Sequence, residues 1–406
     1  MLLAQPDSLP RLKIYGYVRV DACYDSRQME ASGDGFLLQY PKVATTGFDG
    51  NDLNANSMAG MTATGSRFGL DFAPFRVKGL NMNLSGRIET DFQGFGASAT
   101  MLRIRHAWLK MNFGKSDLLA GQTWHPFYDN CFPNVLDLNA GLPYQPFARN
   151  PQLRYSFSAA GAKLYAVALY QTQFTSAGPE GRSTIYQKNA KIPELVAGID
   201  YQINAFTIGF AAEYKQLQPR TASALNATQP IAVDEKVSST AFNAYIQYTQ
   251  RLLTLKAKTV YGQNLTDLTM LGGYAATDTT AQGKRLYKPF NTIAGWLTAD
   301  YQWTQNSPWH INLFAGYSKN LGCDHAILAP ANELPVYGNV MYDGKMLSET
   351  LRGSMQVSYI VPNWVLALEY SYNKAFYGTP DLAKGKATGT KSVDGSRVLA
   401  VLTFLF

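Results

Sequence analysis

The sequence predicts an all-β protein, a transmembrane antiparallel β-barrel of 16 strands with short periplasmic turns and long extracellular loops. Three observations predict it. Apolar and polar residues alternate with period two, short connections alternate with long ones, and charged residues mostly share one parity. The composition agrees, because only 16% of the 406 residues are charged, while 46% are hydrophobic and 13% aromatic. No run reaches the ~18 apolar residues of a membrane-spanning helix, and so aromatic a chain is not intrinsically disordered.

The first strand shows the alternation clearly. Between residues 12 and 22, even-numbered positions are apolar or small, from Leu12 to Ala22, and odd-numbered positions are polar or charged, from Lys13 to Asp21. A shift of one residue would exchange the two faces. The same pattern places the strands at about 12–22, 60–73, 80–92, 99–113, 117–123, 151–157, 162–174, 193–203, 206–217, 237–249, 253–263, 291–303, 309–319, 348–359, 364–376 and 393–406. Residues 1–11 are then an N-terminal periplasmic segment, and 12–406 form one barrel.

The connections between strands alternate in length. Short ones carry turn residues, as at 113–116, 158–161, 204–205, 304–308 and 361–363. Long polar segments lie between them, near 25–59, 124–150, 175–192, 218–236, 264–290, 320–347 and 377–392, and only the connection at 94–98 on that side is brief. So many long loops would be unusual in a compact soluble domain, but they are typical of outer-membrane barrels.

The two faces of each strand fit a lipid-exposed outside and a polar lumen. Arg67 and Asp71, for example, oppose Phe68 and Leu70. An Arg or Lys on the lipid face near the midplane would cost roughly 2–4 kcal/mol, so charged side chains are expected to point inward. Aromatic residues beside the short turns are expected to form a girdle at the membrane boundary: Phe113, Phe206, Trp303, Trp309 and Trp364.

The strand at 99–113 does not fit this rule. If Arg103 and Arg105 point inward, strict alternation turns His106, Trp108 and Lys110 outward. That arrangement would place these three side chains at a subunit contact or at the membrane interface.

The C-terminal strand gives an independent signal. Alternate residues from Val398 to Phe406 are apolar, and the chain ends on Phe406, as in the last strand of bacterial outer-membrane proteins. We expect the barrel-assembly machinery to recognise this end through Phe406. The alternative is a terminal strand of a soluble β-sandwich. In the barrel, an even number of strands puts both termini on the same side of the membrane.

A series of motifs in the first 160 residues resembles a known family. The segments are Gly16–Ala22, Gly65–Gly69, Gly86–Phe92, Leu102–Leu109, Leu119–Trp124 and Asn150–Tyr155. Their succession is similar to that of the DcaP-like porins of Gram-negative outer membranes. The resemblance implies a trimeric channel of 16 strands that takes up small anionic solutes such as dicarboxylates, in contact with the lipid bilayer and lipopolysaccharide. Those porins can carry an N-terminal helical extension, whereas here the first strand begins near residue 12, so the chain gives no support for trimerisation by a coiled coil.

Inward-facing arginines on neighbouring strands form the predicted solute pathway. They are Arg19, Arg67, Arg87, Arg103, Arg105 and Arg154. Guanidinium groups stay charged and bind carboxylates through two parallel hydrogen bonds, so such a row favours anions. In the alternative, the row is neutralised in a structural network by carboxylates of the same parity: Asp21, Asp71, Glu89 and Asp91. Further inward cations are expected elsewhere on the wall: Lys256, Lys258, Arg352 and Arg397.

The loop at 123–150 is the candidate constriction. It is rich in aromatic residues and proline, and its expected constriction residues are Trp124, His125, Phe127 and Tyr128. A barrel of 16 strands encloses an aqueous interior wide enough to need narrowing. The alternative is an outer loop packed on its neighbours or on another subunit.

Other functions find little support. The four histidines never fall at metal-ligand spacing and no catalytic Ser, His and carboxylate set stands out, so we expect no enzyme, no metal site and no cofactor. Cys23, Cys131 and Cys323 are far apart, and an odd number leaves at least one thiol unpaired. Acidic segment 49–54 lacks the distant Glu of an EF-hand, and so calcium binding there has weak support.

The basic residues are dispersed, which argues against nucleic-acid binding despite the formal charge of +7. The main alternative to a porin is a structural barrel or docking platform for other surface proteins, with little or no conductance.

Overall fold

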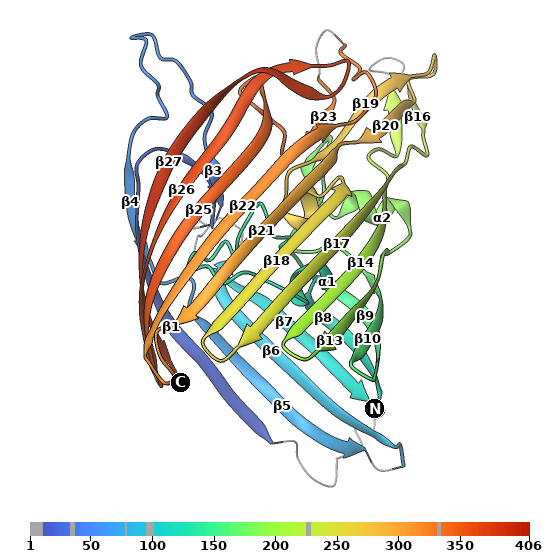
Figure 1. Cartoon of the computed structure of the whole chain (residues 1–406). Helices are drawn as coiled ribbons and strands as arrows, with labels where there is room; N and C mark the ends of the chain where they lie inside the picture. The colour runs from blue at the N-terminus through green and yellow to red at the C-terminus, as the bar shows by residue number, and fades with distance from the viewer. Residues whose placement is uncertain (1–10, 33–36, 78, 95–100, 225–228, 331–333) are drawn as a thin grey trace.

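The computed structural model describes residues 11–32, 37–77, 79–94, 101–224, 229–330 and 334–406, and these form a closed antiparallel barrel (Figure 1). Its wall has 16 strands. The first half consists of β1 (Leu12–Asp25), β5 (Arg67–Val77), β6 (Met82–Gly94), β7 (Met101–Asn112), β8 (Ser116–Trp124), β9 (Arg149–Ala159), β10 (Ala162–Leu169) and β13 (Glu194–Ile203). The second half consists of β14 (Phe206–Leu217), β17 (Val237–Gln250), β18 (Leu253–Gln263), β21 (Asn291–Gln302), β22 (Trp309–Gly322), β25 (Lys345–Val361), β26 (Trp364–Asp381) and β27 (Lys386–Leu405).

Each wall strand pairs with the next one along the chain, and the last pairs with the first. β1 runs antiparallel to β27, and the backbones of Gly16 and Phe406 exchange both hydrogen bonds, N–H to carbonyl, at 3.1 Å. No wall strand is therefore left with an open edge, as a barrel in lipid requires.

The long loops at the extracellular end carry short elements of their own. The first loop contains β2 (Met29–Ser32), β3 (Leu37–Pro41) and β4 (Met58–Thr62), of which β4 pairs with β1. The others contain α1 (Pro126–Asp129), β11 (Ala177–Gly178), β12 (Gly181–Arg182), α2 (Ile185–Ala190), β15 (Ala222–Ala224), β16 (Pro230–Ala232), η1 (Thr266–Leu268), β19 (Gly273–Thr279), β20 (Arg285–Pro289), β23 (Val336–Gly338) and β24 (Met341–Tyr342). No helix among the described residues is long and apolar enough to cross a membrane.

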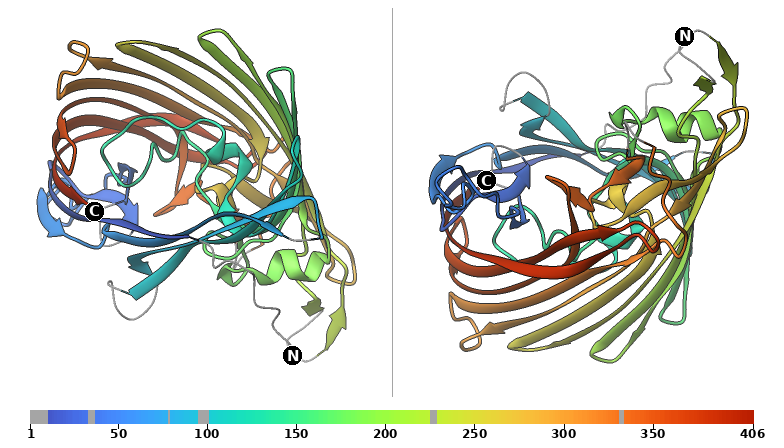
Figure 2. Two further views of the ribbon diagram at one scale, coloured as in Figure 1. Left: turned by 90° about the horizontal axis from the view of Figure 1, so that it is seen from below. Right: turned by 90° about the horizontal axis from the view of Figure 1, so that it is seen from above.

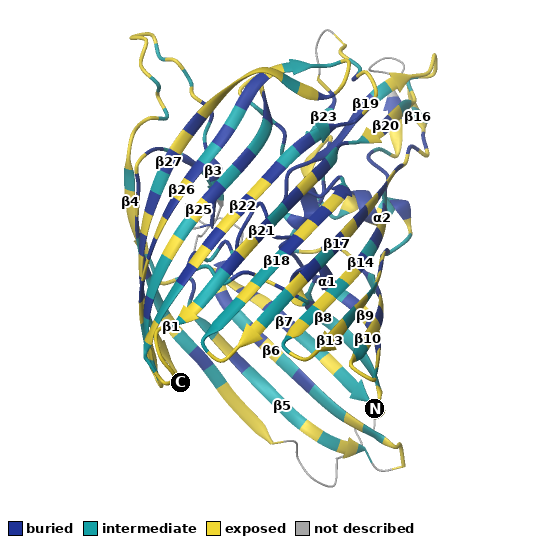
Figure 3. Ribbon diagram, in the orientation of Figure 1, coloured by how far each residue is buried: buried dark blue, intermediate teal, exposed yellow. Residues whose placement is uncertain are grey.

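The exposure of the wall strands alternates as expected for a barrel in lipid (Figure 3). In β14, Ile208 and Phe210 are exposed, whereas Ala211, Glu213 and Lys215 are buried on the inner face. The five aromatic residues of the predicted girdle are all exposed beside their short turns. Apolar area is thus on the outside and charge on the inside, the reverse of a soluble protein.

All 16 predicted strands lie within or overlap wall strands. Some boundaries differ, as for the strand predicted at 162–174, which ends at Leu169, and one predicted loop was wrong. The segment 377–392, expected to be a long loop, is largely strand, because β26 continues to Asp381 and β27 begins at Lys386. Alternation is lost in this hairpin, since its residues 386–392 are mostly exposed, while hydrogen bonds still pair the two strands. The predicted segment 1–11, apart from Arg11, and most of the connection 94–98 lie outside the described residues.

Candidate functional site

The loop from residue 125 to 148, called L3 here, lies inside the barrel (Figure 2). His125 caps α1: its Nδ1 accepts a hydrogen bond from the Phe127 N–H at 3.2 Å. L3 is fastened to strands on different sides of the wall. Arg19 donates to the Leu136 carbonyl at 2.7 Å, Glu369 accepts the Leu136 N–H at 2.8 Å, and Lys258 donates to the Phe127 carbonyl. The loop therefore crosses the lumen, as a separate layer from the wall.

L3 and the wall enclose a cavity of about 170 Å³. It is lined by Arg19, Leu37, Arg67, Gln93, Arg103, Arg105, Trp124, Tyr128, Phe132, Pro133, Val135, Leu136, Asp137, Leu138, Ala140 and Phe147. Four guanidinium groups thus face this space with one carboxylate, which is itself bound by Arg397 at 3.0 Å.

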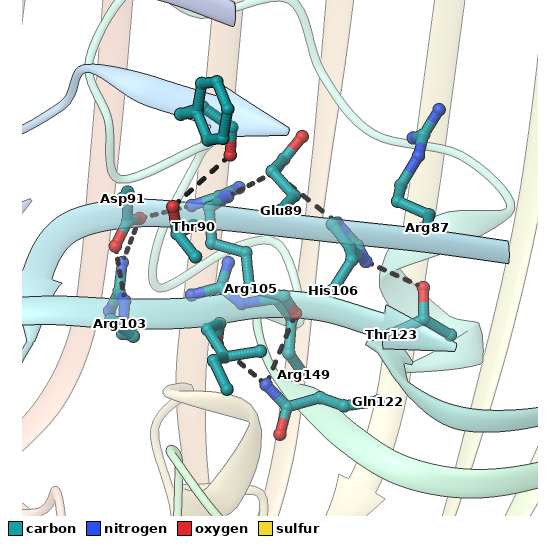
Figure 4. A network of polar contacts seen from close by, with 12 residues as sticks. Arg87, Glu89, Thr90, Asp91, Arg103, Arg105, His106, Gln122, Thr123 and Arg149 are labelled. Atoms are coloured by element: carbon teal, nitrogen blue, oxygen red, sulfur yellow. Dashed lines mark hydrogen bonds and ion pairs between the residues drawn. The ribbon is translucent and has the colours of Figure 1, made fainter. Parts of the chain in front are cut away.

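The arginines of β7 are paired with carboxylates of β6 (Figure 4). Arg103 binds Asp91 at 2.6 Å, and Arg105 binds both Glu89 and Asp91 at 2.7 Å. Arg19 pairs likewise with Asp21 at 2.5 Å. Asp21, Glu89 and Asp91, the alternative partners predicted from the sequence, therefore do form ion pairs with the arginines.

Arg67 differs from these arginines. Among the described residues its side chain makes no hydrogen bond or ion pair, and its guanidinium carbon lies 5.2 Å from the centre of the Tyr17 ring. It contributes a positive charge to the cavity lining, and no carboxylate among the described residues forms an ion pair with it.

Two of the six predicted pathway arginines do not line this cavity. Arg87 binds Asp71 at 2.6 Å, with both side chains about one-third exposed. Arg154 binds Asp129 of α1 at 2.8 Å and donates to the Trp124 carbonyl at 2.9 Å, so it helps to hold L3. The predicted row is thus divided between the cavity and its surroundings.

The expectation that His106, Trp108 and Lys110 point outward was wrong. The pairing of β6 with β7 shifts between Glu89 and Thr90, which face His106 and Ile104, so Arg105 is an extra residue in β7. Such a bulge restarts the alternation. Arg105 and His106 are consequently both buried, and the ring of Trp108 lies 5.9 Å from the guanidinium of Arg87. Leu109 is exposed on the outer face, so its neighbours Trp108 and Lys110 are on the inner face.

The predicted constriction residues separate into two pairs. Trp124 and Tyr128 line the cavity as a stack with ring centres 3.9 Å apart, and Phe132 continues it at 5.5 Å from Tyr128. Phe127 packs into a buried apolar cluster on the wall, and His125 is fully buried. The first pair can contact a solute, while the second pair anchors the loop.

His125 belongs to a buried group that the sequence did not reveal, called the acid cluster here. Its members are His125, Glu194, Glu213, Lys215 and Asp267. Lys215 binds Asp267 and lies 3.7 Å from Glu213, and His125 Nε2 lies 3.5 Å from Glu213. These residues come from L3, β13, β14 and η1, so no local spacing could have indicated them.

The side chains of His125, Glu194 and Glu213 are close enough to surround a cation, with ligand atoms within 4.8 Å of one another. The tautomer of His125 argues against cation binding at this site. Burial, with the nearby charge of Lys215, lowers the pKa of His125 well below its ordinary value, so the ring is neutral. Because Nδ1 accepts the Phe127 N–H, the hydrogen is on Nε2 and points toward Glu213. Through His125 and Glu213 the cluster brings L3 against β14.

The remaining sequence candidates are local structure. The three cysteines are free and buried. In the acidic segment, Asp49 accepts hydrogen bonds from the backbone and side chain of Asn51, and Asp52 accepts the N–H groups of Thr45 and Asn54 and an ion pair from Arg27. These carboxylates stabilise the turn in the first loop.

A closed barrel of 16 strands with an apolar outer face, charged residues on its inner face and a loop folded into the lumen defines a porin-type channel. The DcaP outer membrane protein family matches residues 6–234, more than half of the chain, and the chain belongs to that family. It is a channel protein of the bacterial outer membrane. No curated protein matches the sequence.

Solved structures with the same fold include three outer-membrane proteins. The outer membrane channel DcaP of Acinetobacter baumannii is 19% identical over 99% of both chains, with a TM-score of 0.69. OmpT of Vibrio cholerae is 12% identical over 99% of both chains, with a TM-score of 0.58. An anion-selective porin from Comamonas acidovorans is 10% identical over 98% of this chain and 99% of that chain, with a TM-score of 0.55. At these identities the likeness shows the fold.

Proposed function

We propose that this porin favours small anions, dicarboxylates among them, as they pass between L3 and the arginines of β1, β5 and β7. The observation that carries the proposal is the cavity lining, where Arg19, Arg67, Arg103 and Arg105 face the aromatic stack of L3. Carboxylates offset part of this charge, but Arg67 has no such partner among the described residues. An uncompensated charge in a narrow pore lowers the barrier for ions of the opposite sign.

The constriction is the second part of the proposal. L3 is held to β1, β18 and β26, so it narrows the lumen as a fixed element. Trp124 and Tyr128 form the apolar side of the passage, and the arginines form the polar side. A solute with a carboxylate and an apolar body would meet complementary surfaces on both sides.

The test is the reversal potential of the purified protein in a planar bilayer under a salt gradient. We expect the sign of an anion-selective channel. Replacing Arg67, Arg103 and Arg105, which line the cavity, by Ala should also weaken block of the current by a dicarboxylate. Cation selectivity would contradict the role of the arginines, and absence of conductance would favour the structural barrel or docking platform.

We also propose that the channel is a homotrimer in contact with lipopolysaccharide, and that Phe406 is read by the barrel-assembly machinery. A trimer form of OmpT from Vibrio cholerae has the same fold. The outer face of β5 to β8 supplies a surface for contact with another subunit. An apolar cavity there is lined by Phe72, Leu84, Ile88 and Leu109, with the small residues Gly86, Ala107 and Ala120 between them. Native mass spectrometry of the detergent-solubilised protein should show three chains, and a monomer would contradict the proposal.

A further inference from the structure

Arg149 is a fully buried arginine at the start of β9 that the sequence patterns did not single out. Its Nε donates to Gln173 at 3.2 Å, but Nη1 and Nη2 have no hydrogen-bond partner. No carboxylate among the described residues forms an ion pair with it. Burying an ion without a counter-charge is unfavourable by several kcal/mol, so the arrangement calls for an explanation.

The surroundings of Arg149 are aromatic. Its guanidinium carbon lies 4.5 Å from the centre of the Trp124 ring and 5.6 Å from the rings of Phe147 and Phe174. Such contacts contribute about 0.5–2 kcal/mol, which does not replace an ionic partner. The aromatic contacts therefore hold the guanidinium in place and leave its charge uncompensated.

The neighbouring carboxylates are already bound by other arginines. Asp91 takes ion pairs from Arg103 and Arg105, and Glu89 takes one from Arg105. In Figure 4, Arg149 lies beside Arg105, and no dashed line joins it to an acid. Together with Arg67, four guanidinium groups lie near only two carboxylates, Glu89 and Asp91. This part of the wall therefore has a surplus of positive charge that a bound anion would balance.

Trp124 and Phe147 both line the cavity and lie against Arg149, which does not line it. The indole lines the cavity and lies close to two guanidinium groups, that of Arg149 at 4.5 Å and that of Arg105 at 5.5 Å. Ring contacts with Tyr128 and Phe147 hold it, and within the described residues no hydrogen bond from its Nε1 fixes its position. A change of side-chain rotamer at Trp124 would therefore open a path from the cavity to Nη1 and Nη2.

We propose that Arg149 is an oxyanion-binding residue behind Trp124, which a carboxylate or phosphate group reaches from the cavity when the indole turns aside. Two oxygens of either group accept the parallel hydrogen bonds that Nη1 and Nη2 offer. The site rests on the proposed anion function and deepens it. It adds a compartment in which an anion is retained, beside the cavity through which it passes.

Tryptophan fluorescence of the full chain in detergent tests the site, because Trp124 lies against Arg149. Titrations with sodium succinate and with sodium phosphate are compared with sodium chloride at matched ionic strength. We expect a saturable change with the oxyanions that chloride does not give and that the Trp124→Phe variant lacks. Saturation by succinate or phosphate alone would support the site and assign it to that anion.

Arg149→Gln should weaken oxyanion binding about tenfold or more, because the charge-assisted hydrogen bonds are lost. Arg149→Lys keeps the charge without the paired geometry, so it should weaken oxyanion binding less than Arg149→Gln does. It also tests the site if the Gln variant fails to fold. Arg76→Gln, at the far end of β5 where Arg76 contacts Asn81 at 3.3 Å, is the control and should bind as the wild type does. Unchanged binding in a folded Arg149→Gln protein would overturn the site.

The failure of the site can be told from failure of the proposed function. A wild-type channel with an anion-selective reversal potential, but no saturable fluorescence change, would overturn the Arg149 site alone. Cation selectivity of the wild type would contradict both.

Discussion

Two charged regions inside the barrel contact L3, and they use charge differently. The basic wall, formed by Arg19, Arg67, Arg103, Arg105 and Arg149, has more cations than its partners Asp21, Glu89 and Asp91 neutralise, and four of its arginines line the cavity. In the acid cluster, Lys215 is enclosed between carboxylates, and every member is buried. In our proposal the first region attracts an anionic solute, whereas the second region holds L3 through His125.

The largest effect is expected when L3, which contacts both regions, is removed. Deleting residues 127–146 of L3 should raise the single-channel conductance severalfold, because the passage would then have the full width of the barrel interior. Deleting residues 48–51 at the tip of the first loop, where Phe48 is fully exposed, is the control and should leave conductance unchanged. Equal conductance of the L3 deletion and the wild type would show that L3 does not narrow the path.

Lys215→Met tests whether the acid cluster is structural. Removing the ammonium group leaves the buried carboxyl groups of Glu213 and Asp267 without their cation. We expect a loss of about 3–5 kcal/mol in the free energy of unfolding, measured with denaturant in detergent micelles. Lys319→Met is the matched control. Its pair with Glu349 at 3.0 Å is 43% and 23% exposed, and exposed pairs contribute at most about 1 kcal/mol. Similar losses in both variants would contradict the distinction.

Arg67→Gln tests the surplus charge of the basic wall. We expect the ratio of anion to cation permeability to fall roughly threefold or more, because one unit charge near the permeating ion changes its energy by about 1 kcal/mol or more. The free energy of unfolding should stay near that of the wild type, since Arg67 loses no ion pair among the described residues. A large loss of stability without a change in permeability would assign Arg67 to the structural region.

The smallest effect is expected at the root of L3. Burial keeps the pKa of His125 below its unfolded value, so the folded protein binds a proton there less readily than the unfolded chain does. Its contribution to stability is complete above the unfolded pKa of about 6.5 and falls as the pH drops below it.

Between pH 8 and pH 5 the unfolding midpoint in detergent, measured by circular dichroism, should therefore fall more for the wild type than for His125→Asn. Asn keeps an acceptor for the Phe127 N–H but does not titrate. The same pH dependence in both proteins would rule out His125 as the source.

The wall strands could be predicted from sequence because lipid imposes a simple rule on every outward side chain. Ile208 and Phe210 follow that rule without any knowledge of their neighbours. The bulge at Arg105 could not be read in this way, since an inserted residue changes the register without a characteristic sequence. The polar hairpin after β26 was assigned to a loop for a related reason: its hydrogen bonds persist where alternation ends.

The candidate site was predictable only in part. Parity identified Arg19, Arg67, Arg103 and Arg105 as inward residues, and they do line one cavity. It could not say which of them keep a free charge, because that depends on pairing across β6 and β7. Arg149 begins its strand next to a loop, where parity carries no information, and the acid cluster joins η1 to residues of L3, β13 and β14 far away in the chain.

The attachment of L3 to β1, β18 and β26 has a mechanical consequence. A wide tube made of one sheet resists stretching along its hydrogen bonds but yields more easily to flattening, which only bends the sheet. A loop tied to different sides of the wall acts as a strut, because flattening must also strain its hydrogen bonds and ion pairs. The width of the passage should therefore be insensitive to the lateral pressure of the surrounding membrane.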